Sequence, residues 1–216
     1  MSKNERNLFD LRILNNGHKD IKRLQRAAGI PNIHGNKFWK SSLLLMDYLS
    51  TFPPLAIRPE LRRKKTVLRV LEIGCGWGLA GIYCAKHFNA EVTSLDADET
   101  VFPYLMHHAE LNGVELDVWQ CRYEKIRKVD LQQYDVMIAA DICFWDELVT
   151  PLFKLIRRAH QAGGIRVIIA DPGRPTFSAV AELCVEKLGA LCEPWSVPHP
   201  HNYRGWVLDM DPNYNG

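Results

Sequence analysis

The stretch "VLRVLEIGCGWGLAGIYCAKHF", residues 67–88, decides the fold of this chain. Residues 67–73 form an apolar run, which is typical of a strand buried on both faces of a sheet. Three glycines, Gly74, Gly76 and Gly78, follow the run, and a helical pattern begins after them. A glycine lets the chain turn sharply and brings backbone N–H groups close to a ligand, because it has no Cβ atom. The stretch therefore predicts a strand, a ligand-binding turn and a helix in succession.

The same alternation of strands and helices continues toward the C-terminus. Further strands are expected at 91–96, 115–121, 134–141, 165–171 and 204–210. Further helices are expected at 99–112, 147–161 and 176–189. Strands that alternate with helices predict an α/β fold with a doubly wound, mostly parallel sheet, which we assign to residues 67–216. In such sheets ligands bind outside the carboxyl ends of the strands.

The segment before this sheet is strongly basic. Residues 1–66 carry 14 Lys and Arg against 5 Asp and Glu, a charge of +9, whereas the remainder carries 13 against 20, a charge of −7. The spacing of leucines predicts a helix over 4–28, broken near "NNGHK", and a second helix over 38–50. A charged linker follows at 58–65. We expect an N-terminal helical, basic cap that attracts an acidic protein, a nucleic acid or an anionic ligand; a solvated helical face remains the alternative.

Composition excludes several classes of protein. The chain has 216 residues, 47% of them hydrophobic, which suits one compact domain with a small appendage. It has no apolar run of 18 residues and no signal-peptide pattern, so we expect neither a transmembrane helix nor secretion. Its six cysteines have no CxxC spacing, which indicates reduced thiols in a cytoplasmic protein. The "HPH" at 199–201 lacks a third ligand, so we expect no metal site, and we place His107 and His108 on the surface.

An acidic residue follows the second strand at the position that a nucleoside needs. Asp96 ends that strand, where a carboxylate can accept both ribose hydroxyls. Read from Gly76, "GWGLAG" matches the dinucleotide pattern GxGxxG, and Asp96 lies 20 residues further on, so spacing alone allows NAD. Glu72 argues against NAD, because a dinucleotide-binding site needs no charged side chain at the end of this strand. A carboxylate at Glu72 can instead face the ammonium group of a ligand.

The segment "VLEIGCGWG" resembles motif I of the class I, seven-stranded S-adenosylmethionine-dependent methyltransferases. The resemblance implies a seven-stranded, Rossmann-like sheet with S-adenosylmethionine as the cofactor. It implies that Gly74, Cys75 and Gly76 line the methionine part, with Glu72 behind them, and that Asp96 holds the ribose. The adenine would lie beside the segment "VWQCRYE", in a register that the resemblance leaves open.

A narrower resemblance lies outside motif I. "HGNKFWKSSLLLMDYL", with Trp39, is similar to the helix that precedes motif I in the protein lysine methyltransferase-like group, methyltransferase family 16, where the Trp lies over the cofactor pocket. "AADICFWDEL" is similar to that group's Asp-x-x-Tyr segment after strand four. "ADPGRPTF" resembles the segment after strand five in the electron-transfer-flavoprotein lysine methyltransferase branch. Phe144 replaces the Tyr, so this chain lacks the hydroxyl of that group.

The candidate chemistry centres on the end of the strand at 134–141. Methyl transfer from a sulfonium needs an uncharged nucleophile held in line, and Asp141 is our candidate for orienting an amine. The alternative for Asp141 is a helix N-cap or a hydrogen bond from a neighbouring N–H. Phe144 and Trp145, with Trp39, form a candidate aromatic wall for a cationic methyl group or acceptor, although core packing is an equal alternative. Ala140, next to Asp141, completes the predicted cofactor site.

The leading hypothesis is a methyltransferase that acts on a nitrogen, most readily a protein lysine. Asp171 and Arg174 can reach the same mouth or form a plain ion pair within their loop. The competing hypotheses are a small-molecule methyltransferase, a nucleic-acid methyltransferase and an inactive module that binds through the cofactor fold. "DICF" lacks the prolines typical of amino-group methylation of nucleic acids, which lowers that option without excluding it.

Overall fold

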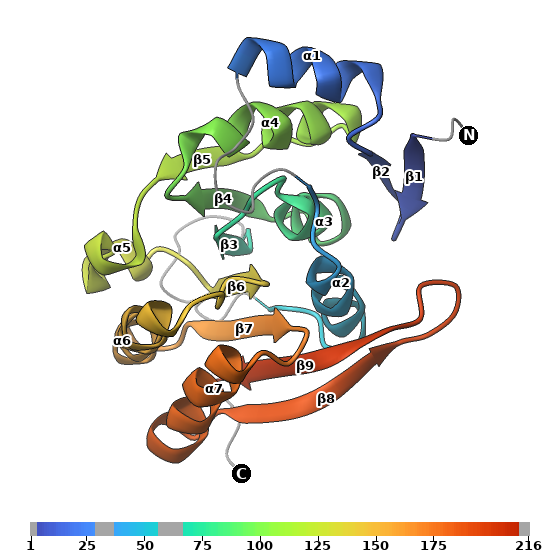
Figure 1. The fold of residues 1–216 in the computed structure, drawn as a ribbon. Coiled ribbons are helices and arrows are strands. Elements are labelled where there is room, and N and C mark those ends of the chain that lie inside the picture. The colour runs from blue at the N-terminus through green and yellow to red at the C-terminus, as the bar shows by residue number, and fades with distance from the viewer. Residues whose placement is uncertain (1–3, 29–36, 56–66, 212–216) are drawn as a thin grey trace.

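A seven-stranded sheet runs through the centre of the molecule (Figure 1). The computed structural model describes residues 4–28, 37–55 and 67–211. The strands are β3 (Arg69–Ile73), β4 (Glu91–Asp96), β5 (Asp117–Gln120), β6 (Val136–Ala140), β7 (Arg166–Asp171), β8 (Leu191–Val197) and β9 (Tyr203–Met210). Their order is β5-β4-β3-β6-β7-β9-β8, and all the pairs in this sheet are parallel except β7–β9 and β9–β8. The predicted doubly wound, mostly parallel fold is confirmed.

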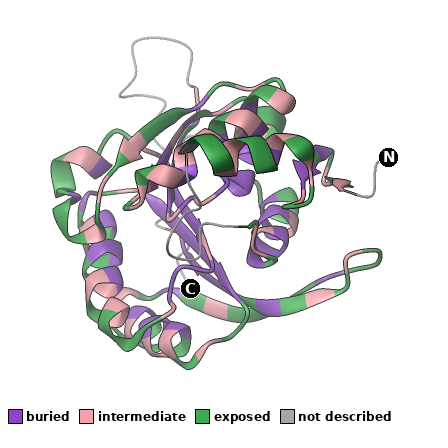
Figure 2. Ribbon diagram, turned by 45° about the horizontal axis from the view of Figure 1, so that its top comes forward, coloured by how far each residue is buried: buried purple, intermediate pink, exposed green. Residues whose placement is uncertain are grey.

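Helices cover both faces of this sheet. One face is covered by α2 (Ser41–Thr51), α3 (Leu79–Phe88) and α4 (Phe102–Leu111), and the other by α5 (Lys128–Leu131), α6 (Val149–Gln161) and α7 (Pro175–Leu188). Side chains alternate along each strand, so Val70 and Val136 join the first core and Leu71 and Met137 the second. Buried strands lie between helices with exposed outer faces (Figure 2). Burial on both faces explains why the strands read as apolar runs.

The N-terminal segment begins with a hairpin, which corrects the predicted helix over 4–28. Strands β1 (Glu5–Leu8) and β2 (Leu11–Leu14) pair antiparallel, and helix α1 begins only at Lys19 and ends at Ala28. The turn between the strands places Phe9 and Asp10 at positive φ. Leu11 and Ile13 are fully buried while Arg12 between them is exposed, which is the alternation of a strand. The prediction of a wholly helical cap is therefore wrong for the residues that form this hairpin.

Helix α4 anchors the hairpin through a histidine that we expected at the surface. His108 is fully buried, and its Nε2 accepts a hydrogen bond of 3.2 Å from the backbone N–H of Leu14. Its Nδ1 lies 2.8 Å from the carbonyl oxygen of Tyr104. Helix α1 in turn packs on α4. The N-terminal segment is thus attached to the sheet domain by buried contacts.

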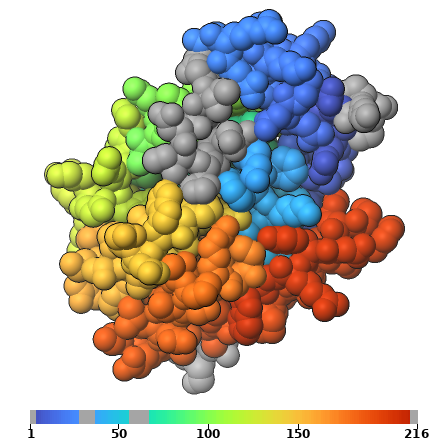
Figure 3. Space-filling model, viewed as in Figure 1, coloured from blue at the N-terminus to red at the C-terminus, as the bar shows by residue number. Residues whose placement is uncertain are grey.

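Helix α2, which the sequence predicts over 38–50, lies between the N-terminal segment and the β8–β9 hairpin (Figure 3). It packs on β6, β7, β8 and β9 and on helix α3, so it is part of the core. The predicted linker at 58–65 and the boundary after residue 66 lie outside the described residues. Within the described part of the chain, no helix has both the length and the apolar character that crossing a bilayer requires.

Candidate functional site

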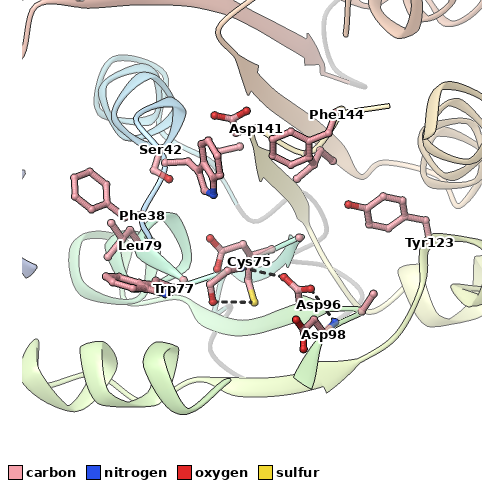
Figure 4. A pocket seen from close by; sticks show the side chains of 18 of the residues that line it. Phe38, Ser42, Cys75, Trp77, Leu79, Asp96, Asp98, Tyr123, Asp141 and Phe144 are labelled. Atoms are coloured by element: carbon pink, nitrogen blue, oxygen red, sulfur yellow. Dashed lines mark hydrogen bonds between the residues drawn. The ribbon is translucent and has the colours of Figure 1, made fainter. Parts of the chain in front are cut away.

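A cavity of about 470 Å³ opens at the carboxyl ends of the parallel strands (Figure 4). It is lined from the ends of β3, β4 and β6, from the loop after β5, and from the segment before α2. Every site residue that the sequence predicts lies on its wall: Trp39, Glu72, Gly74, Cys75, Gly76, Asp96, Ala140, Asp141, Phe144 and Trp145. The structure therefore brings these residues together, and their individual roles stay predictions.

The glycine turn and Asp96 form the floor of the cavity. Asp96 Oδ2 accepts a hydrogen bond of 3.1 Å from the backbone N–H of Gly76, and its Oδ1 accepts one of 3.0 Å from the N–H of Asp98. Gly76 has a φ of 51°, and a Cβ atom built there would meet no atom within 4 Å. Such a side chain would extend into the cavity, so glycine keeps this space open. Burial raises the pKa of Asp96, which its backbone hydrogen bonds oppose.

Glu72 lies deeper, behind the turn. It is 4% exposed, and its Oε2 accepts a hydrogen bond of 2.8 Å from Ser94, the residue beside it on β4. A Cβ atom on Gly81 would lie 2.5 Å from the same oxygen, so a larger residue there would force this carboxylate to shift. Burial raises the pKa of Glu72 to about 7. A cationic ligand group nearby would favour the ionised form.

The loop after β5 supplies the residues whose register the sequence left open. Arg122, Tyr123 and Glu124 line the cavity, and the Tyr123 hydroxyl lies near Gly74, 3.1 Å from the position of a Cβ built there. Burial raises the pKa of Tyr123, so its hydroxyl is neutral and can donate a hydrogen bond. Sequence reasoning missed Tyr123 as an individual residue. Its only signal was its place just after the third parallel strand.

Three aromatic rings form one side of the cavity mouth. The ring centroids of Trp39 and Phe144 are 5.5 Å apart, and those of Phe144 and Trp145 are 6.0 Å apart. The Lys37 ammonium lies 4.3 Å from the Trp39 ring, and the Arg174 guanidinium 4.6 Å from the Phe144 ring. Two protein cations thus already use the faces of these rings. The predicted aromatic wall exists, and Trp145 is 45% exposed rather than packed in the core.

Asp141 does not cap a helix. The N-cap positions that follow it belong to Trp145 and Leu148. Asp141 has a φ of 61° and is 4% exposed; its Oδ2 accepts a hydrogen bond of 3.1 Å from Ser41, and its Oδ1 is ion-paired with Arg174. A left-handed backbone is uncommon at residues other than glycine; it occurs in turns and clusters at functional sites, which fits a role for Asp141.

The charges on the wall favour a ligand with cationic groups. Among the described lining residues, the acids Glu72, Asp96, Asp98, Glu124 and Asp141 outnumber the bases Lys37 and Arg122. Among the same described parts of the chain, no cluster of three His, Cys, Asp or Glu side chains could hold a metal ion. The cavity is thus acidic at its base and aromatic at its mouth.

Known proteins resemble this chain in sequence and in fold. The electron transfer flavoprotein beta subunit lysine methyltransferase of Rattus norvegicus is 26% identical over 65% of this chain and 51% of its own length. The ubiquinone biosynthesis O-methyltransferase of Ruegeria pomeroyi is 31% identical over 55% of this chain and 47% of its own length. The chain thus spans about half the length of these relatives.

A solved structure shares the fold at low sequence identity. The tRNA (uracil-54, C5)-methyltransferase of Pyrococcus abyssi, in complex with S-adenosyl-L-homocysteine, matches with a TM-score of 0.57 and 16% identity, over 97% of this chain and 44% of that one. This likeness shows the Rossmann-like methyltransferase fold. The family model described as "Lysine methyltransferase" matches residues 19–176, which is most of the chain. This chain therefore belongs to the lysine methyltransferase family, methyltransferase family 16.

Proposed function

We propose that this chain binds S-adenosylmethionine in the cavity and transfers its methyl group to the side-chain nitrogen of a protein lysine. The observation that carries the proposal is the cavity itself, with an open glycine turn, Glu72 and Asp96 on its floor and Asp141 at its aromatic mouth. Glu72 fits the ammonium of the methionine part, Asp96 the ribose hydroxyls, and Tyr123 the adenine end. The Pyrococcus abyssi structure holds the demethylated form of this cofactor, which supports the assignment.

Bound S-adenosylmethionine supplies an already activated methyl group, so the protein mainly positions the acceptor. Trp39, Phe144 and Trp145 surround the path to the floor, and a cationic side chain is favoured where it meets a ring face that Lys37 and Arg174 do not cover. Asp141 accepts a hydrogen bond from the acceptor amine and so orients the amine nitrogen toward the cavity. In this role Asp141 touches the reacting nitrogen.

The wall favours an amine over a hydroxyl as acceptor. A hydroxyl needs a general base near neutral pH, most often a histidine. None of the described residues lining the cavity is a histidine, and Asp141 is already paired with Arg174. The lysine-specific relative supports the amine, whereas the Ruegeria pomeroyi relative, by its name, supports a small-molecule hydroxyl. A nucleic-acid acceptor has the least support from this wall.

We further propose that basic side chains of the N-terminal segment attract an acidic acceptor protein to the cavity. Lys37 and Trp39 from this segment line the cavity, and the Arg6 guanidinium lies 5.9 Å from the ring of Phe38 beside them. The six cysteines in the described residues are free, which fits a reducing compartment such as the cytoplasm.

The test is methyl transfer to a defined acceptor. The chain is incubated with methyl-labelled S-adenosylmethionine and the electron transfer flavoprotein beta subunit, and the labelled site is located by mass spectrometry. Label on a lysine, reduced in D96A together with binding of S-adenosylhomocysteine, supports the proposal. We expect D96A to weaken that binding by about 1–3 kcal/mol, the scale of a hydrogen bond to a charged group. Label on a phenolic hydroxyl of a small molecule, or no cofactor binding, contradicts it.

A further inference from the structure

A charged triad, defined as Asp141, Asp171 and Arg174, joins the ends of two neighbouring strands. Asp171 ends β7, is fully buried, and accepts hydrogen bonds of 2.8 Å on Oδ1 from the backbone N–H groups of Gly173 and Arg174. Its Oδ2 accepts a bond of 2.9 Å from the Arg174 side chain. The same Arg174 nitrogen is ion-paired with Asp141. Asp171 thus fixes the arginine, and the arginine reaches the carboxylate at the cavity mouth.

Arg174 does not line the cavity, but it contacts two residues that do, Asp141 and Phe144. Two carboxylates and one guanidinium leave the triad with a formal charge of −1. A cationic acceptor therefore meets one net negative charge at Asp141, where two would remain without the arginine.

This difference in charge matters for an amine acceptor. A lysine enters as an ammonium, and a nearby carboxylate favours that charged form, which cannot attack. The amine must release a proton to solvent; its freed electron pair then forms the carbon–nitrogen bond, and the carbon–sulfur electron pair stays on sulfur. Without the arginine, the two negative charges would bind the ammonium tightly and keep its proton on the nitrogen.

We propose that Arg174 is a positioning residue that offsets the charge of Asp141. The site then captures the acceptor well, and the bound amine still loses its proton. The inference rests on the proposed function. Arg174 acts through Asp141 and touches neither acceptor nor cofactor.

Other groups around Asp141 leave this balance to Arg174. Helix α2 presents the Ser41 hydroxyl to Asp141, and β9 presents Tyr203, whose side chain shares a hydrogen bond with Ser41. The Ser41 hydroxyl carries no charge, and burial raises the pKa of Tyr203, so its hydroxyl is neutral as well. The ammonium of Lys40 lies over the Tyr203 ring, at 5.8 Å. Glu72 and Asp96 on the cavity floor add negative charge. Among these described neighbours, Arg174 is the cation that pairs with Asp141.

The test compares R174M with R174K in the full chain. The maximal rate of lysine methylation is measured from pH 6 to 10 at saturating cofactor and acceptor. In R174M we expect the rising limb to move to higher pH by about one to two units, the scale of one charge removed at roughly 6 Å in an effective dielectric constant of about 20. We expect a KM for the acceptor that is equal or lower. R174K keeps the charge and should keep the limb within about half a unit of the wild type.

A second variant tests the inference even if R174M does not fold. D141N removes one negative charge, so its limb should move to lower pH while its KM for the acceptor rises. Binding of S-adenosylhomocysteine and the melting temperature report whether each variant is folded. Equal loss of rate at every pH in R174M and R174K, or an unmoved limb in folded R174M and D141N, overturns the role of Arg174 and leaves the proposed function standing. Absence of amine methylation by the wild type overturns both.

Discussion

Glu72 is a carboxylate that folding places in a poor environment for its charge. Burial raises its pKa to about 7, although Ser94 and the backbone N–H groups of Gly81 and Ala80 favour the ionised form. Its pKa in the unfolded chain is near 4.5. Because the folded pKa is the higher one, the stability that this group contributes is present below pH 4.5 and is lost as pH rises through 7. A cationic ligand compensates for this cost when it binds.

The first prediction is that E72Q stabilises the ligand-free protein at pH 8 and weakens cofactor binding. Gln keeps the shape and one acceptor oxygen and has no charge to desolvate, so the gain in unfolding free energy has an upper limit of about 3 kcal/mol, from the shift in pKa. Between pH 5 and 8, the melting temperature should change less with pH for E72Q than for the wild type. Equal slopes for the two proteins would show that Glu72 is not buried as a charge.

Gly76 offers a cleaner test of the cofactor position. In G76A the new methyl group meets no protein atom within 4 Å, so the variant should fold, at a cost of about 1 kcal/mol for its positive φ. The methyl group extends into the cavity, so we expect binding of S-adenosylhomocysteine to fall at least tenfold in calorimetry. G113A is the matched control, because Gly113 also has positive φ and open space but does not line the cavity. Equal binding by both variants would place the cofactor elsewhere.

At the scale of elements, His108 fastens the β1–β2 hairpin to α4. Burial lowers its pKa to about 4, so at pH 7 the ring is neutral, with Nε2 accepting from Leu14 and Nδ1 donating to Tyr104. We predict that H108A loses about 2–4 kcal/mol of unfolding free energy at pH 7, because a cavity opens and a buried N–H is left without its acceptor.

The pH dependence gives this third prediction its control. The folded pKa of His108 lies below the usual 6.5, so its contribution is complete above pH 6.5 and declines as pH falls toward 4. The difference in denaturant midpoint between wild type and H108A should therefore shrink on acidification. A constant difference from pH 7 to 4.5 would contradict a neutral buried ring.

The hairpin also shows where sequence periodicity is ambiguous. Leu8, Leu11 and Leu14 are three residues apart, which fits one face of a helix, while Leu11 and Ile13 alternate with exposed Arg12 as in a strand. The pairing of β1 with β2 decided between the two, and such pairing is not local information. Strand β8 was missed because it is an edge strand with Pro194 and a mostly exposed surface. The buried central strands had no such ambiguity.

Residues that line the cavity could be predicted from the sequence, whereas the contacts that hold them in place could not. Parallel strands bring their carboxyl ends to one edge, so residues following β3, β4 and β6 had to meet once the fold was known. The sequence left Asp171 and Arg174 open between a local ion pair and a place at the cavity mouth. Contact between Arg174 and Asp141 depends on the register of β6 and β7, which pairs Ala140 with Ala170. Register of this kind is set by packing across the whole sheet.

For the whole molecule, part of the positive charge of residues 1–66 lies on helix α1, whose Asp20 is outnumbered by four bases. Lys19, Lys22 and Arg26 are exposed on α1. Deleting the segment cannot test its role, because Leu11, Ile13 and Ile21 are fully buried and their removal would open the core. Substitution of the exposed charges leaves these contacts in place.

The last prediction concerns capture of the acceptor. A variant with K19E, K22E and R26E should raise the KM for an acidic acceptor protein about tenfold at low salt and change kcat little, since surface charge acts mainly on encounter. The difference should largely vanish at about 0.5 M salt, where exposed charges are screened within a few ångströms. The control reverses Lys154, Arg157 and Lys187, which are exposed on α6 and α7 and alter the net charge equally. If that control raises KM as much, net charge and not helix α1 attracts the acceptor; if neither does, the basic segment has no part in capture.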